Sequence, residues 1–187
     1  MNVDRDERGV TLSARRYLED AARDLFPGGV RQQPTTPTQE SLAKDVAAPL
    51  APSDALDRSR TSRYQTIVGI LLYLSMTTRP DLAYAAAMYS RRTQNATSAL
   101  LLQAERSFMY AYHTRDIGIT YARSIDTHLS SAWAPYSHLD ICGSSDADWS
   151  VRRSTSGWEF RFAGGIVACA PDRIRNLLGC PRPLVVT

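Results

Sequence analysis

The sequence predicts an α+β fold in which a helical region precedes an antiparallel sheet. Two observations carry this prediction. Apolar residues recur at helical spacing in successive segments between residues 64 and 113, and they alternate with smaller or polar residues between 117 and 170. The 187 residues, of which 43% are hydrophobic, can bury one core of ordinary size or two small ones.

The N-terminal segment is predicted to form a hairpin. Short strands around residues 2–3 and 10–12 flank a polar turn at 6–9, in which Gly9 can adopt a positive φ. Because this hairpin starts at the first residue without a lead-in, we expect the natural fold to begin upstream.

A helix is predicted after the hairpin, followed by a long connector. Ser13 is the expected N-cap of the helix, and Pro27-Gly28-Gly29 ends it. Segment 30–62 carries four prolines among Thr, Gln, Ser and Ala and offers no periodic apolar face. Since loops of this length are uncommon inside compact domains, we expect an extended connector that crosses a surface or separates two lobes.

Three further helices and a sheet are predicted next. The first helix, from Tyr64 to Ser75, should be nearly all buried and should end before Pro80, which begins the second. The third helix should run from Ser98 to about His113. Four strands in succession then predict an antiparallel sheet after the helices, with strands at 117–121, 139–143, 158–162 and 166–170.

Composition excludes several classes of protein. The longest apolar run, 67–76, is about half of the ~20 residues that a membrane-spanning helix needs. We therefore expect no membrane partner, and because no secretory signal is visible we expect an intracellular protein, cytoplasmic or nuclear. The three cysteines are too far apart for a metal site or a disulfide framework. A net charge of +3 is too small to draw the chain strongly onto nucleic acid.

Three segments, in this order, resemble the copia-type retrotransposon polyprotein. They are YQTIVGILLYLSMTTRPD at 64–81, QAERSFMYAYHTRDIGITYAR at 103–123, and SDADW at 145–149 with RRSTSG at 152–157. The opening RGVTLSARRYLEDAARDLF at 8–26 resembles the strand and helix that precede them in the family. Order and spacing carry the resemblance, which implies the C-terminal part of a reverse transcriptase followed by the start of a ribonuclease H domain.

The resemblance implies a truncated α+β arrangement of five regions: hairpin plus helix of the reverse transcriptase tail at 1–29, an extended Pro-rich connector at 30–62, a helical connection region at 63–123, incomplete ribonuclease H-like antiparallel strands at 136–170, and an off-pattern tail at 171–187.

The family's catalytic machinery is matched only in small part. Its polymerase centre holds two metals on a Tyr-X-Asp-Asp turn, which this sequence lacks, so we expect no polymerase activity. Its ribonuclease H cleaves RNA/DNA hybrids with paired Mg²⁺ ions held by converging carboxylates. Asp146 matches the first of these catalytic and metal-binding acids, but the family's later acidic segments are absent. We therefore expect an inactive remnant that binds no Mg²⁺.

Other interpretations of these residues stay open. Arg152, Arg153, Ser154 and Thr155 could grip a phosphate through guanidinium and hydroxyl groups, or they could form a solvated turn. The former would give weak binding of an RNA/DNA hybrid without catalysis. On a strand, Asp146 and Asp148 would share one face, which allows a weak single-metal site with residual nuclease activity. Their Asp-X-Asp spacing also occurs in glycosyltransferases, although no sugar-nucleotide domain precedes it. The oligomeric state is left open.

Overall fold

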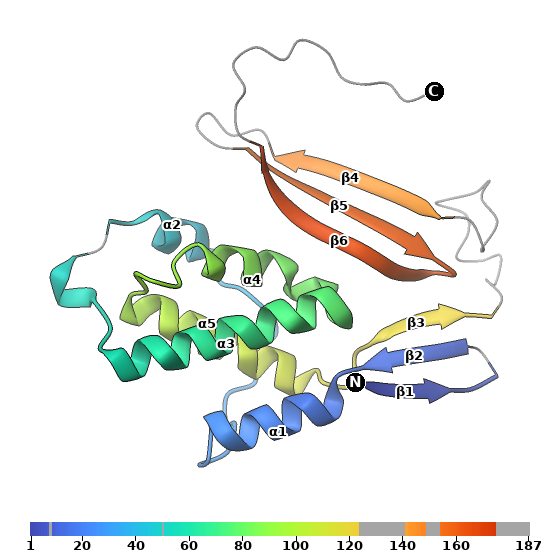
Figure 1. The fold of residues 1–187 in the computed structure, drawn as a ribbon, viewed down its shortest axis with the longest axis horizontal. Helices are drawn as coiled ribbons and strands as arrows, with labels where there is room; N and C mark the ends of the chain where they lie inside the picture. The colour runs from blue at the N-terminus through green and yellow to red at the C-terminus, as the bar shows by residue number, and fades with distance from the viewer. Residues whose placement is uncertain (8, 50, 124–140, 149–153, 175–187) are drawn as a thin grey trace, which may run out of the picture.

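The computed structural model of this chain describes residues 1–7, 9–49, 51–123, 141–148 and 154–174. Within these residues a group of helices lies beside two three-stranded antiparallel sheets, whose strand orders are β1-β2-β3 and β4-β5-β6 (Figure 1). The predicted α+β class is confirmed. None of the described helices combines the length and the hydrophobicity that crossing a membrane requires.

The elements follow one another in this order along the chain: β1 (Asn2–Arg5), β2 (Gly9–Ser13), α1 (Arg15–Leu25), α2 (Leu42–Ala47), the 3-10 helix η1 (Pro52–Asp54), α3 (Arg58–Thr77), the 3-10 helix η2 (Pro80–Leu82), α4 (Ala83–Ser90), α5 (Ser98–His113), β3 (Ile119–Ala122), β4 (Cys142–Asp148), β5 (Ser154–Phe162) and β6 (Gly165–Ile174). Helix α5 has the predicted bounds, and β6 extends into the segment that was predicted to be off-pattern.

The helices bury one continuous hydrophobic cluster. Its members on η2 and α4 include Leu82, Ala85, Ala86 and Tyr89, which recur at helical spacing. Phe108 of α5 is fully buried and stacks on Phe26, so this aromatic position of α5 serves packing. Helix α3 is less buried than predicted, because Tyr73 and Met76 are 42% and 83% exposed.

Two helix starts differ from the prediction. Ser13 ends β2, and α1 begins after Ala14 without a side-chain cap. Helix α3 begins before Tyr64, at Arg58, where the Asp57 carboxylate accepts a hydrogen bond from the Arg60 amide at 2.8 Å. The prediction missed this cap because no periodic apolar residues mark the first turn of α3.

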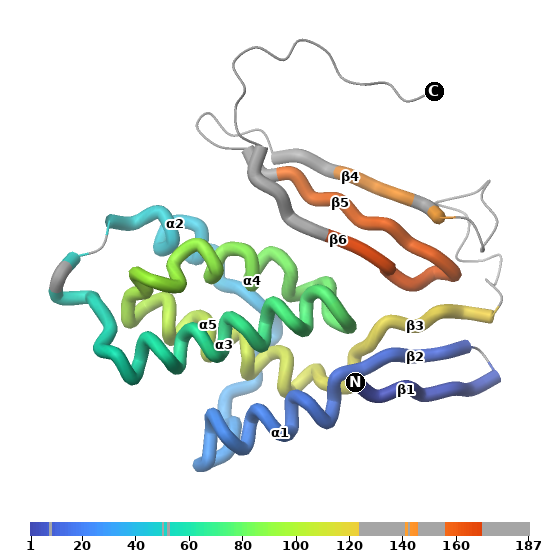
Figure 2. The backbone as a smooth tube through the Cα atoms, viewed as in Figure 1, coloured from blue at the N-terminus to red at the C-terminus, as the bar shows by residue number. Residues whose placement is uncertain are grey.

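The connector between α1 and α3 was predicted to be extended, and this prediction is wrong in part. Helix α2 interrupts the connector and buries Leu42 and Val46. Much of its backbone is bonded by side chains from later helices. Arg106 and Ser107 of α5 donate to the carbonyl oxygens of Thr36 and Pro37. In Figure 2 the light-blue part of this segment crosses behind α5 on its way from α1 to α2.

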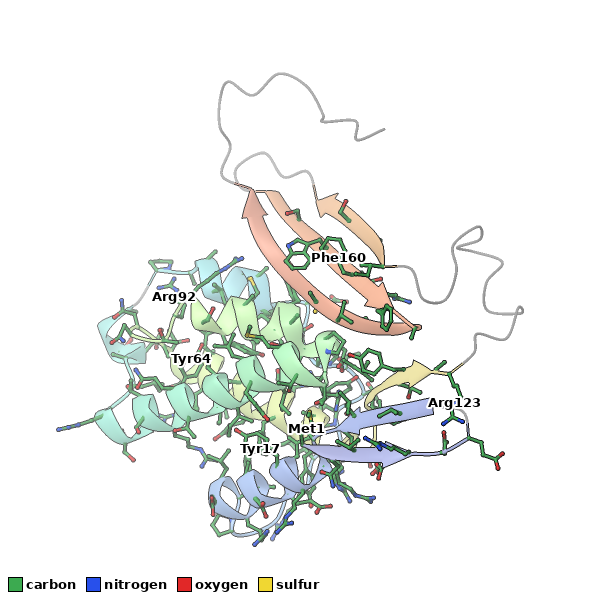
Figure 3. The ribbon with its side chains drawn as sticks, turned by 45° about the vertical axis from the view of Figure 1, so that its right-hand side comes forward. Met1, Tyr17, Tyr64, Arg92, Arg123 and Phe160 are labelled. Carbon is green, nitrogen blue, oxygen red and sulfur yellow. The ribbon has the colours of Figure 1, made fainter. Side chains whose placement is uncertain are left out.

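Arg92, labelled in Figure 3, holds the end of α2 in the same way. It follows α4 and donates to the carbonyl oxygens of Val46 and Ala48. These carbonyls lie at the C-terminal end of α2, where a helix leaves its last acceptors without internal donors. The arginine therefore caps a helix that lies far from it in sequence.

Strand β3 was predicted to begin the C-terminal sheet, and this prediction is wrong. It pairs antiparallel with β2 instead, with Val10 opposite Tyr121. Gly9 permits this close pairing, because a Cβ there would collide with the backbone of Tyr121. Periodicity identifies a strand but not its partner, so the hairpin of β1 and β2 could not be matched to β3 from sequence alone.

Arg79 is the most completely bonded side chain described and is 1% exposed. Its guanidinium donates to both carboxylate oxygens of Asp81, at 2.9 and 2.8 Å. It also donates to the carbonyl oxygens of Ala111 and Thr114, at 3.3 and 3.0 Å, and to the Thr114 hydroxyl at 2.8 Å. One side chain therefore ties the junction between α3 and α4 to the C-terminal end of α5.

Arg79→Met should lower the free energy of unfolding by about 1–3 kcal/mol, because the carbonyl oxygens of Ala111 and Thr114 would lose their donor. Urea denaturation would measure the loss. Arg23→Met removes an exposed arginine that pairs with Asp20 and should change stability by less than about 1 kcal/mol. A similar small loss in both variants would contradict the structural role of Arg79.

Alkaline pH should destabilise the fold through its buried tyrosines. Burial raises the pKa of Tyr89 to about 12, whereas an unfolded tyrosine ionises near 10. The contribution of Tyr89 is therefore complete below pH 10 and is lost as the pH rises toward 12. Tyr89→Phe should reduce the fall in unfolding free energy between pH 8 and pH 11 by about 1 kcal/mol. Exposed Tyr84→Phe is the control, and equal falls in both variants would refute the assignment.

Candidate functional site

Asp146 lies in β4, where its backbone pairs with Gly157 of β5, and Asp148 pairs with Thr155. The two aspartates therefore occupy alternate positions on one strand, which the single-metal interpretation requires. Strand β4 lies further along the chain than the strand predicted at 139–143. Their side chains lie outside the described part of the structure, as do those of Ser154 and Thr155 at the start of β5. The predicted phosphate-binding pair at 152 and 153 lies outside the described residues altogether.

Glu159 is an acid near Asp146 that the sequence reasoning missed. It pairs with Ser144, two residues before Asp146, so the two acids take diagonal positions on the same face, about 7–8 Å apart. The Ser144 hydroxyl donates to Oε1 of Glu159 at 3.1 Å, and two nitrogens of Arg161 donate to the same oxygen at 2.8 Å. The charge of Glu159 is therefore compensated by its own strand.

The opposite face of this sheet carries aromatic rings. Trp158 and Phe160 alternate with Glu159 along β5, and their ring centroids are 5.5 Å apart. The Phe160 ring covers Gly143 on β4, where a Cβ would come within 2.7 Å of it. Both rings remain exposed, at 37% and 44% (Figure 3 labels Phe160).

Two adjoining cavities separate the β4-β5-β6 sheet from the helices. The larger, about 620 Å³, lies between the start of α4 and the sheet, and its lining includes Tyr84, Ser144 and Glu159. The smaller, about 350 Å³, reaches the first sheet and the end of α3. Both cavities are lined by Pro80, Asp81 and Ile166, so we name them together the inter-sheet groove.

The smaller cavity is lined by polar residues from five places in the fold, namely the end of α3, η2, α5, β3 and β5: Thr78, Asp81, Tyr110, Thr120 and Arg161. Thr78 is 1% exposed, and its Oγ1 has no hydrogen-bond partner among the described residues. Burial, followed by the nearby charge of Asp81, raises the pKa of Tyr110, so its phenol stays protonated at neutral pH. No sequence pattern predicted that these residues meet.

The hairpin between β5 and β6 joins the two sheets at the end of this groove. Its turn residues Ala163 and Gly164 both have positive φ, 49° and 79°, as two-residue hairpin turns require. The Ala163 carbonyl oxygen accepts a hydrogen bond from the Ala122 amide at 2.9 Å. The Tyr121 hydroxyl donates to the Ile166 carbonyl oxygen at 3.1 Å.

The described side chains were compared with the grouping that a metal ion needs. Among the side chains that the structure describes, no three histidines, cysteines, aspartates or glutamates come together as a set that could hold a metal ion. Cys169 pairs with Glu159 in the sheet, and burial together with that acid raises the pKa of its thiol. The predicted metal residue Asp146 thus stays a prediction.

Comparison with known proteins gives two relatives. No family model matches the sequence, and no solved structure matches it. Secreted RxLR effector protein 161 of Plasmopara viticola is 32% identical over 118 residues, which cover 61% of this chain and 75% of that protein. A transposon Ty5-1 protein of Saccharomyces cerevisiae is 26% identical over 182 residues, which cover 97% of this chain but only 54% of that protein.

Gly165→Ala should loosen the junction between the sheets, because the new Cβ would lie 2.7 Å from the Tyr121 ring and 2.9 Å from Ile119. We expect a loss of about 1–3 kcal/mol in unfolding free energy and faster hydrogen exchange along β6. Gly157→Ala, in the same sheet, is the control, because nothing lies within 4 Å of its Cβ. Equal effects of the two substitutions would show that packing at Gly165 does not hold the sheets together.

Proposed function

Because this chain belongs to the same family as secreted RxLR effector protein 161 of Plasmopara viticola and has a retrotransposon-related origin, we propose that it is a catalytically inactive remnant of a copia-type polyprotein. In this proposal it carries the end of a reverse transcriptase and the start of a ribonuclease H. Similarity to the Ty5-1 protein along 97% of the chain supports the proposal. The name of the P. viticola protein describes it as a secreted effector, and we do not extend either property to this chain.

The surroundings of Asp146 support the proposed inactivity. Cleavage by paired metal ions needs several carboxylates that converge on both cations. Glu159 lies on the same face as Asp146, but its carboxylate is bonded to Arg161 and Ser144 within the sheet. The positive charge of Arg161, which is bonded to Oε1 of Glu159, opposes the approach of a cation to this acid. The pair of carboxylates is therefore a poor starting point for metal binding.

Weak binding of an RNA/DNA hybrid without catalysis is the second candidate function. The observation that favours it is the inter-sheet groove, which reaches both Gly157, the strand partner of Asp146, and the half-exposed guanidinium of Arg161. Arginine forms bidentate hydrogen bonds with phosphates, so the groove offers a nucleic acid strand at least one suitable contact. The predicted residues Arg152, Arg153, Ser154 and Thr155 would add further contacts where β5 begins.

A nuclease assay tests the proposed inactivity. The protein and its Asp146→Asn variant should both leave a labelled RNA/DNA hybrid uncut, in Mg²⁺ or in Mn²⁺, because Asp146 alone cannot hold paired cations. An intact ribonuclease H serves as the positive control. Metal-dependent cleavage that Asp146→Asn abolishes would overturn the proposal and favour residual nuclease activity.

A filter-binding titration at two salt concentrations tests the second candidate. Hybrid affinity should fall as salt rises, because phosphate contacts release counterions. Arg152→Ala with Arg153→Ala should weaken binding and reduce the salt dependence if these residues contact phosphates. An absence of binding at low salt would remove the second candidate and leave the inactive remnant.

A further inference from the structure

We infer that the outward face of the β4-β5-β6 sheet is a docking surface for residues 175–187 of the same chain. Three aromatic rings on β5, those of Trp158, Phe160 and Phe162, define this surface, and we name it the aromatic face. The polarity of the sheet, the size of the aromatic face and the composition of the segment that follows β6 carry this inference. The docking does not depend on nucleic acid binding.

The β4-β5-β6 sheet turns a polar face toward the helices. Ser144, Glu159 and Cys169 lie side by side across its three strands and line the larger cavity beside α4. An antiparallel sheet with one solvated face ordinarily packs its apolar side chains inward and leaves the polar ones in water. The arrangement here is the reverse, so the helices do not supply the apolar cover that this sheet needs.

The aromatic face carries the large apolar side chains of the sheet instead. Trp158, Phe160 and Phe162 alternate with the polar residues of β5 and are 37%, 44% and 38% exposed (Figure 3 labels Phe160). The strand partners of Phe160 are small, Gly143 on β4 and Ala168 on β6, so its ring stands above both neighbouring strands. Exposed apolar side chains gathered in this way mark a surface that another element covers.

The size of the aromatic face argues against a second copy of the chain as its occupant. Three strands at a spacing of about 4.8 Å and the nine residues of β5 give a face of about 14 Å by 30 Å, or about 400 Å². A stable interface buries about 800 Å² on each partner. A segment of the same chain needs less area, because it does not lose the translational and rotational freedom that association costs.

Residues 175–187 have the composition and the length for this position. They lie outside the described residues and follow Ile174, which ends β6. Thirteen residues span up to about 45 Å when extended, which exceeds the length of about 30 Å of β5. The segment can therefore reach every ring of the aromatic face. Five of its side chains are large and aliphatic: Leu177, Leu178, Leu184, Val185 and Val186.

The charges of this segment also suit the aromatic face. Arg175 and Arg182 are its only charged side chains, and it contains no aspartate or glutamate. Arginine stacks its planar guanidinium on aromatic rings, and tryptophan is the ring that attracts it most strongly. Neither basic residue therefore opposes docking beside Trp158.

Acrylamide quenching of Trp158 fluorescence tests the docking in the full chain. The sequence contains three tryptophans, and Trp133→Phe with Trp149→Phe leaves Trp158 as the only one. Docking should protect this ring from the quencher. The helical circular dichroism should stay constant in all variants, because the segment lies outside the hydrophobic cluster of the helices, and this readout verifies that each variant is folded.

Serine substitutions in the segment should expose the ring. In the single-tryptophan background, Leu177→Ser with Leu178→Ser should raise the quenching constant severalfold, because the segment loses the apolar contact that holds it on the sheet. Asn176→Ser is the matched control, because it exchanges one polar side chain of the segment for another, and it should leave the quenching constant unchanged.

A chain that ends at Ile174 should be quenched as strongly as the serine variant. Equal quenching of the parent chain, the serine variant and the shortened chain would overturn the docking. Protection that appears only as the protein concentration rises, together with a dimer in sedimentation equilibrium, would show that a second copy covers the aromatic face and would overturn it as well.

Discussion

The pairing of the buried Arg79 guanidinium with the partly exposed Asp81 carboxylate is the interaction on which the rest of the structure depends. Removing a guanidinium from water is costly, and the cost is offset only when its donors find acceptors of good geometry. Asp81 and the backbone at the end of α5 supply them together. These acceptors lie on η2 and at the end of α5, so the fold must bring both elements together around one side chain. The same bonds fix the position of Pro80 and Asp81, which line the inter-sheet groove.

Local patterns predicted the local elements well, and long-range pairing was where prediction failed. Helix α5 was predicted with its correct bounds because Thr97 caps a strongly periodic segment whose apolar face is buried. Strand β3 was recognised but assigned to the wrong sheet, since alternation says which face of a strand is buried and nothing about its neighbour. Helix α2 was missed because its six residues offer only Leu42 and Val46 as apolar contacts.

The sequence predicted less of the candidate site than of the fold. Resemblance led to Asp146, but the acid on the same face, Glu159, became visible only once the register of β4 and β5 was known. Glu159 and Arg161 lie two residues apart on β5, so their side chains point to the same face. Strand alternation could therefore have predicted their ion pair from the sequence. Thr78 carries no signal at all in sequence, because its missing partner is a property of the packed interior.

The arginine and serine bonds to the connector have a consequence for how this protein can be divided. A cut near residue 50 would follow the proline-rich composition, and each resulting piece would expose groups that the other now satisfies. Arg92 and Arg106 would lose carbonyl acceptors, while the short helix α2 would lose its distant cap. The connector therefore does not separate two modules, because its backbone is bonded to residues that follow α4 and lie in α5, and helices α1 to α5 form one folding unit.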